Sequence, residues 1–166
     1  MAHDLTGLIA EVESAGGDYV ANPAGGLLAP GASTSTSVPV EDHNRNLSIV
    51  GMLLPTNDGF AGLDSAWVPR RPGTYTYYLN GYDAGTEAND ELITGGGAPG
   101  VPGIPAAPGE DAGSGGTGAA GPDSNPYVHI HRGVLGDTDL AGGISDLDSR
   151  IHRWLNPVAR IVIHVN

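Results

Sequence analysis

The chain has 166 residues, no cysteine and a formal net charge of −12. Phosphate contacts need a basic surface, so this charge argues against a nucleic-acid partner. The missing cysteines exclude disulfides, thiolate metal sites and a cysteine nucleophile. The longest apolar run, Leu47 to Leu54, is too short to cross a bilayer. The length predicts one domain, residues 1–166, and the 27 glycines and 13 prolines predict long loops.

Residues 4 to 14 are predicted to form a short helix. Apolar residues recur there at helical spacing, Asp4 can cap the start, and two glycines follow the end. Further on, residues 33 to 40 alternate between apolar and polar and predict an edge strand, because Pro39 cannot donate to a ladder.

Residues 47 to 54 are apolar on both faces, which predicts a central strand. Alternation predicts further strands over Thr74 to Leu79, Tyr127 to Arg132 and Ala159 to Val165. Several short strands separated by turn residues are typical of an antiparallel β-sandwich. The fold class expected is therefore all-β, with one or two short helices.

Residues 95 to 126 form an insert rich in glycine and proline. It opens with three Gly-X-Pro triplets between Gly97 and Pro105, too few for a collagen triple helix. The composition predicts an extended loop of polyproline-II type. Because the free energy of loop closure changes slowly with length, removal of the insert is expected to leave the sandwich folded.

Two acid-rich segments follow predicted strands, Pro55 to Ser65 and Gly81 to Glu91. Loops that leave neighbouring strands can converge at one end of a sandwich, and calcium takes six to eight oxygen ligands. Carboxylates gathered without a cation would have strongly raised pKa values. The alternative is that Asp58 and Gly59 form only a turn and that the second segment is a solvated loop. The residues alone do not separate the two.

These segments, PTNDGFAGLDS and YDAGTEANDE, resemble motifs of the spondin N-terminal domain found in F-spondin, mindin and bacterial exported proteins. The closing NPVARIVI resembles the last strand of that domain. The resemblance runs from about Leu27 to Asn166, with the insert as an interruption, and implies a C2-like β-sandwich with calcium bound by loops at one end. It implies the calcium ligands Asp58, Asp83 and Glu87, with Asp64 and Asp90 as weaker candidates.

The resemblance also implies the function class. Spondin domains are adhesion or extracellular-matrix modules, so the chain is expected to be secreted or on the cell surface, without catalytic activity and with its leader outside this sequence. Its partner would be an extracellular protein, a glycan or a copy of itself.

A second acidic segment predicts another cation site. Asp137, Asp139 and Asp148 stand at positions 1, 3 and 12 of an EF-hand-like loop, although Ala141 at position 5 offers no side-chain oxygen. The alternative is a polar connection in which Ser145 caps a short helix.

Two histidines suggest a different chemistry. His129 and His131 share one face of a predicted strand, a spacing that can chelate zinc if His152 supplies a third ligand. This pattern predicts, as another alternative, a metal-dependent hydrolase. More often such histidines pair with carboxylates.

The start of the chain predicts an open sheet edge. Spondin domains begin with an apolar strand, whereas this sequence begins with the helix, so the edge beside residues 159 to 165 lacks a neighbour. Strand addition from another chain or an upstream segment would fill it and build an oligomer or filament. The alternative is that Tyr19 to Leu28 folds back over this edge.

Overall fold

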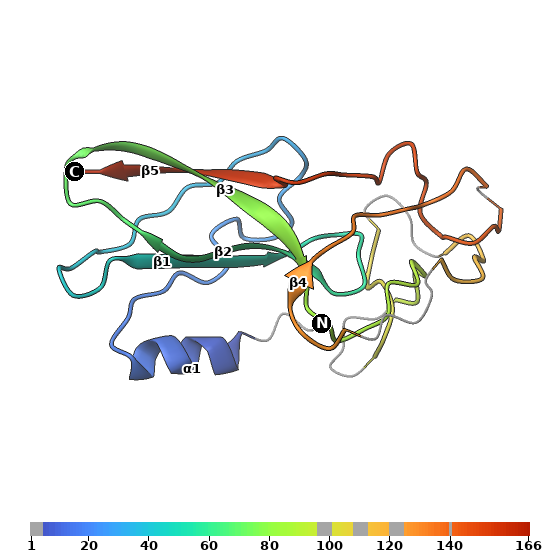
Figure 1. Ribbon diagram of the computed structural model, residues 1–166, viewed down its shortest axis with the longest axis horizontal. Coiled ribbons are helices and arrows are strands. Elements are labelled where there is room, and N and C mark those ends of the chain that lie inside the picture. Colours follow the sequence, from blue (N-terminus) through green and yellow to red (C-terminus); the bar gives the residue numbers. More distant parts are fainter. Residues whose placement is uncertain (1–4, 96–100, 108–112, 120–124, 140) are drawn as a thin grey trace. The chain divides into compact units, whose positions relative to one another are not determined.

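The computed structural model describes residues 5–95, 101–107, 113–119, 125–139 and 141–166 (Figure 1). It confirms an antiparallel all-β fold with one short helix. The elements are α1 (Thr6–Ser14), β1 (Asn46–Met52), β2 (Gly59–Trp67), β3 (Gly73–Asp83), β4 (His129–Ile130) and β5 (Ala159–Val165). The chain divides into two compact units, residues 3–46 and residues 47–166. The single domain expected from the length stays a prediction.

The first unit contains α1 and irregular chain. The expected cap, Asp4, lies outside the described residues, and Leu5 at the N-cap position makes no side-chain capping bond. The helix ends where Gly16 takes a positive φ of 71° and the Gly17 amide bonds to the Val12 carbonyl at 2.9 Å. The strand predicted over residues 33–40 is wrong, because these residues pair with no strand. Alternation without a pairing partner is not sufficient for a strand.

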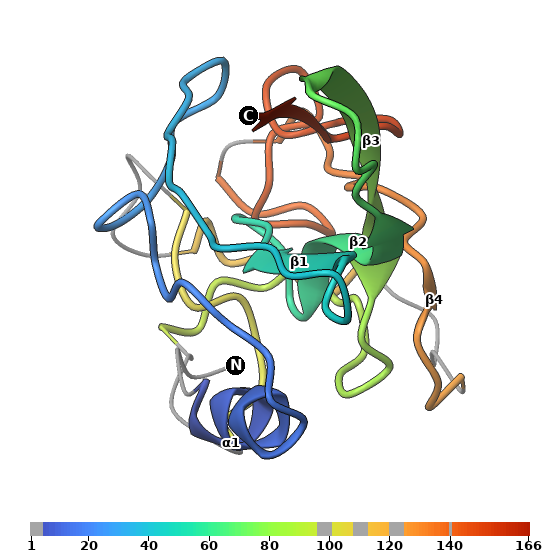
Figure 2. The same cartoon turned by 90° about the vertical axis from the view of Figure 1, so that its left-hand side faces the viewer.

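The second unit is organised around β3, which exchanges partners along its length. Its first part, Gly73 to Leu79, pairs with β5, and its last residues pair with β2 and β4. Figures 1 and 2 show β3 running from β5 towards β2 and β4. The sheet order is β1-β2-β3-β4, with β5 also on β3.

β5 and β4 occupy the same edge of β3. The Leu79 carbonyl accepts from Val158, and the Gly81 carbonyl accepts from His131. Residues two apart in a strand direct their backbone groups to the same edge. Between the two strands, the Asn156 side chain accepts a 2.7 Å hydrogen bond from the Gly81 amide and so replaces a missing strand residue.

Several strand boundaries differ from those predicted. β2 lies in a segment expected to be a loop, and the strand predicted over residues 47–54 is at the end of the sheet rather than at its centre. β3 continues to Asp83, and β4 is only two residues long. The composition of β2 predicts a loop, because glycine and small polar residues are typical of turns. These residues are Gly59, Gly62, Asp64 and Ser65. Tertiary pairing outweighs that preference.

Most buried apolar residues lie outside the strands. Ile104, Ala107, Val134 and Leu147 form the buried cluster, and Ile93 and Trp154 pack against it. Two of the cluster residues, Ile104 and Ala107, come from the insert, so this part of the insert belongs to the core. Ile104 is completely buried, so the insert is not a solvated loop throughout; that the sandwich folds without the insert stays a prediction.

Candidate functional site

The loops beyond the carboxyl end of β3 form one folded region, here called the loop end: residues 53–58, 84–95, 101–107, 113–119, 131–139 and 141–149. It is visible beyond β4 in Figure 1. Its buried polar and charged residues are Thr56, Asn57, Asp58, Asn89, Glu91, His131, Ser145, Asp146 and Asp148, and Asp83 is buried at the adjoining end of β3. Unpaired buried carboxylates are costly, so their partners decide what this region can do.

Asp58 joins the two acid-rich segments. Its Oδ2 accepts hydrogen bonds from the Thr86 amide at 2.7 Å, the Thr86 hydroxyl at 2.8 Å and the Glu87 amide at 3.0 Å. Its Oδ1 is buried and has no hydrogen-bond partner in the described part of the chain. The segments thus converge, and one carboxylate oxygen at their junction lacks a partner.

Asp83 lies beside this junction, since Gly59 pairs with Asp83 across β2 and β3. Asp83 Oδ1 accepts from the Gly85 amide at 2.8 Å, and Oδ2 accepts from Asn89 Nδ2 at 2.5 Å. The His129 ring nitrogen Nε2 is 3.9 Å from Oδ2. Asp83 is therefore held by the chain's own donors, with a histidine at the rim.

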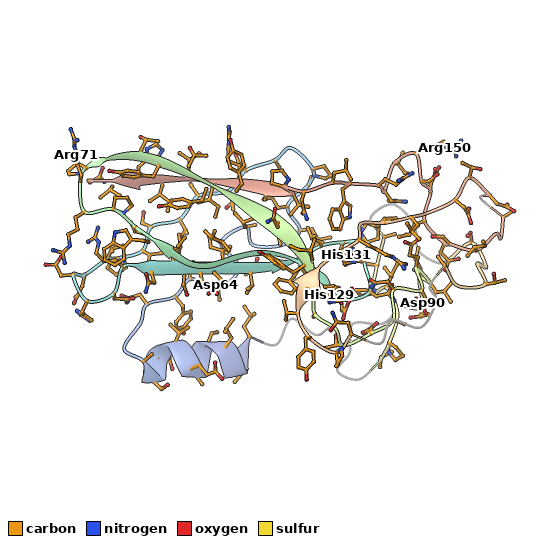
Figure 3. All side chains as sticks on the ribbon, in the orientation of Figure 1. Asp64, Arg71, Asp90, His129, His131 and Arg150 are labelled. Atoms are coloured by element: carbon orange, nitrogen blue, oxygen red, sulfur yellow. The ribbon has the colours of Figure 1, made fainter. Side chains whose placement is uncertain are left out.

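The other predicted calcium ligands are placed differently. Glu87 Oε2 accepts from the Gly103 amide at 2.7 Å. Asp90 Oδ1 accepts from Asn57 at 2.8 Å and from the Leu92 amide at 3.1 Å. Asp64 lies along β2, apart from the loop end that contains Asp90 (Figure 3), and its Oδ1 accepts from Ser65 at 2.8 Å. Asp64 does not join the other ligands.

The side chains of the loop end therefore supply only part of the ligands that a metal ion needs. Over the described ranges of the chain, no three carboxylate or imidazole side chains come together as a group that could hold an ion. Backbone amides already bond to many of the carboxylate oxygens. What fits a cation is the buried, unpartnered Oδ1 of Asp58, because calcium binds carboxylate oxygens and completes its shell with carbonyls and water.

Glu91 organises the loop end, although it was not predicted as a site residue. Its Oε1 accepts from the Leu135 amide at 2.7 Å, and its Oε2 accepts from the Gly136 amide at 2.8 Å and the Ser145 hydroxyl at 2.6 Å. Arg132 is 3.8 Å away. All of these partners are more than 40 residues distant in sequence, so no local pattern could have identified the role of Glu91.

Asp146 holds the glycine-rich insert. Its Oδ1 accepts from Ser114 at 3.1 Å and from the Gly116 amide at 2.8 Å, and its Oδ2 accepts from the Ile93 amide at 2.8 Å. Burial raises the pKa of Asp146, but these hydrogen bonds together lower it below its ordinary value. A Cβ on Gly113 would lie 2.2 Å from Oδ2, so only glycine permits this close approach.

The EF-hand-like segment satisfies its carboxylates internally. Asp137 Oδ2 accepts from the Ile144 and Ser145 amides, and these bonds lower the pKa of Asp137. Asp139 Oδ1 accepts from the Ala141 amide at 3.1 Å. Arg150 binds both oxygens of Asp148 and lowers the pKa of that carboxyl to about 2. Both oxygens of Asp148 are thus bound by an arginine.

The alternative helix after Ser145 is not present either. The described residues from 141 to 158 contain turns and bends but no helix. Ser145 does act as a local cap, since its hydroxyl accepts from the Leu147 amide at 3.0 Å. Leu147 belongs to the buried cluster and Trp154 packs against it, whereas Ile151 is exposed.

His131 is not available as a metal ligand in this geometry. Its Nδ1 accepts a 2.9 Å hydrogen bond from the Gly133 amide, so the neutral ring carries its proton on Nε2, which is buried without a partner among the described residues. The ring lies 5.1 Å from Trp154, and a Cβ on Gly59 would approach it to 3.1 Å. Burial lowers the pKa of His131, although Asp83 and Asp58 act in the opposite direction. The histidine pair does not offer two lone pairs to one zinc ion.

Comparisons with known proteins identify no relative. No family model, no curated protein and no solved structure matches the chain. The resemblance to spondin domains therefore stays a prediction. None of the helices in the described ranges is long and apolar enough to span a membrane.

Proposed function

We propose that the protein is a non-catalytic adhesion or extracellular-matrix module, secreted or on the cell surface, whose loop end takes up calcium. The sequence resemblance to the C2-like spondin sandwich supports this proposal. The exchange of β3 between β5 and β2 is also compatible with two packed layers, because strands that change partners make the corners of sandwiches. The partner class is an extracellular protein or glycan.

Asp58 Oδ1 is the observation that carries the calcium part. A buried acceptor without a donor costs about 1–3 kcal/mol, more for a charged group. Of the buried carboxylates Asp58, Asp83 and Glu91, Glu91 has the Arg132 guanidinium at 3.8 Å. A bound calcium ion would supply a partner for Oδ1 and offset part of the negative charge. Asp83 and Glu87 are the proposed further ligands, and they would have to exchange their hydrogen bonds from Gly85, Asn89 and Gly103 for the ion.

Thermal unfolding with calcium or with a chelator tests this proposal. A ligand that binds only the folded state at 100 times its Kd adds about 2.7 kcal/mol, which here corresponds to a rise in Tm of about 5–10 °C. Asp58→Asn should remove this calcium-dependent rise, whatever its effect on the chelated protein. Asp139→Asn, on an exposed residue of the other acidic segment, is the matched control and should keep it.

Two results would contradict the calcium proposal. One is an identical Tm of the wild-type protein in calcium and in chelator. The other is an equal loss of the calcium response in both variants. In the first case, a water between Asp58 Oδ1 and the Nε2 proton of His131 would be the better explanation of the two unpartnered atoms.

A second candidate function is a subunit of an extracellular assembly built by strand addition. The outer edge of β5, which pairs with no strand in the described part of the chain, favours this candidate and does not depend on calcium. The zinc hydrolase predicted as a further alternative has no comparable support.

A further inference from the structure

β5 has one complete edge that no strand of the described residues pairs with. Its register with β3 runs without interruption from Ala159 opposite Leu79 to Val165 opposite Gly73. The Leu79 carbonyl is directed towards β5, so the backbone groups of Tyr77 and Tyr75 are directed there too. Their partners are Ile161 and Ile163, which leaves the amides and carbonyls of Arg160, Val162 and His164 on the outer edge.

Nothing in the described chain pairs with this outer edge. β3 is the only strand recorded as a neighbour of β5 among the residues that the structure describes. Edge strands usually carry proline, lysine or a bulge that prevents further pairing. From Ala159 to Val165 the sequence is ARIVIHV, with one arginine as its only charged residue apart from histidine. The edge is therefore open to another strand.

Charge favours contact between two copies at this place. Each chain has a net charge of −12, which opposes self-association elsewhere on the surface. Neither β5 nor the part of β3 that pairs with it, Gly73 to Leu79, contains an acidic residue. Arg160 adds a positive charge. Two copies that meet through β5 thus keep their acidic loops apart.

The strand is also complementary to itself. If two β5 strands pair antiparallel about Val162, Arg160 lies opposite His164 of the second copy, and Val162 lies opposite its counterpart. These are the residues whose backbone groups are directed outwards, so every pair can exchange hydrogen bonds. Ile161 then lies opposite Ile163 of the second copy. This pairing extends the half-buried apolar row that Tyr75 and Tyr77 begin on the same face.

We propose that β5 pairs with β5 of a second copy, which gives a two-fold symmetric dimer with one sheet continuous across both chains. This association stops at two chains, because each copy has one β5 and pairing occupies its outer edge. It differs from a head-to-tail filament, in which β5 of one copy would pair with β1 at the other end of the sheet of the next.

Sedimentation equilibrium of the wild-type chain and two variants tests the dimer. Val162→Pro removes an amide from the outer edge and leaves the ladder to β3 intact, whereas Val162→Thr keeps that amide. The wild type and Val162→Thr should have twice the mass of the chain. Val162→Pro should weaken association about tenfold or more, since hydrogen bonds are lost symmetrically. Raising the salt concentration should strengthen the wild-type dimer, because it screens the repulsion between acidic chains.

Crosslinking separates the dimer from the filament and does not depend on the fold of the proline variant. The chain has no cysteine, so Val162→Cys introduces a unique thiol. Under oxidation it should form a disulfide-linked dimer by itself. Crosslinking only when Val162→Cys is mixed with Val50→Cys, on β1, would overturn the proposal in favour of a filament. A wild-type chain that is monomeric at every protein and salt concentration would also overturn it, and chelator should have no effect on the dimer.

Discussion

The strands and the loop end satisfy their backbone groups in different ways. In β3 and β5, amides bond to carbonyls of the neighbouring strand, yet most side chains are half-buried or exposed. In the loop end there is almost no regular structure, and carboxylates accept the amide hydrogen bonds instead. Glu91 and Asp146 alone fix segments from three regions of the chain. The comparison teaches that irregular chain can form the most buried part of a protein when acidic side chains replace strand partners.

The largest expected effect comes from the core of the loop end. Ile104→Ala should lower the free energy of unfolding by about 2–5 kcal/mol, because it leaves a cavity at a fully buried position. Val101→Ala, at an exposed position of the same insert, is the control and should change it by less than about 0.5 kcal/mol. Urea unfolding measures both. Equal small effects would mean that the insert is a loose loop after all.

The second-largest loss of stability is expected from replacing a buried carboxylate of the loop end. Glu91→Gln should cost about 2–3 kcal/mol, because the amide group cannot accept all three hydrogen bonds and leaves a buried donor unpaired. Glu13→Gln on the exposed surface of α1 provides the comparison. Urea unfolding measures the free energy of unfolding of both variants. If the two variants are equally stable, the buried carboxylates do not hold the loop end together.

Two glycines test the boundary between the regions. A Cβ on Gly81 would lie 2.6 Å from the Trp154 ring, whereas a Cβ on Gly51 meets nothing within 4 Å. Gly81→Ala should therefore lower the free energy of unfolding by about 1–3 kcal/mol. Gly51→Ala, in the open strand β1, should be neutral or slightly stabilising. Thermal unfolding of the two variants gives the difference directly, and the reverse order would contradict the packing of Trp154 on the sheet.

The smallest expected effect is the change in the free energy of unfolding with pH that His131 causes. Burial lowers the pKa of His131 in the folded protein, while Asp83, Asp58 and Glu91 oppose this and Arg132 adds to it. As the pH falls below the ordinary histidine pKa of about 6.5, the unfolded chain takes up a proton first. The free energy of unfolding should therefore decrease until the pH reaches the folded-state pKa.

Replacement of the histidine isolates this contribution. His131→Gln should flatten the dependence of stability on pH between 7 and about 5.5, a window above the titration of ordinary carboxyls. His43→Gln, at an exposed histidine, should leave the slope unchanged. Chemical unfolding at a series of pH values measures the slopes. A wild-type slope in His131→Gln would show that another group titrates.

The sequence by itself determined the helix, the antiparallel all-β class, the core of β3 and the whole of β5, because these depend on local periodicity. It left open whether the two acid-rich segments meet or form a turn and a solvated loop. Only the tertiary structure decided that Gly59 to Trp67 is a strand, that β1 is an edge and that Ile104 is core, since pairing partners and burial come from distant residues. For the same reason Glu91 emerged as the centre of the loop end: its donors at Leu135, Gly136 and Ser145 reach it only when the chain has folded.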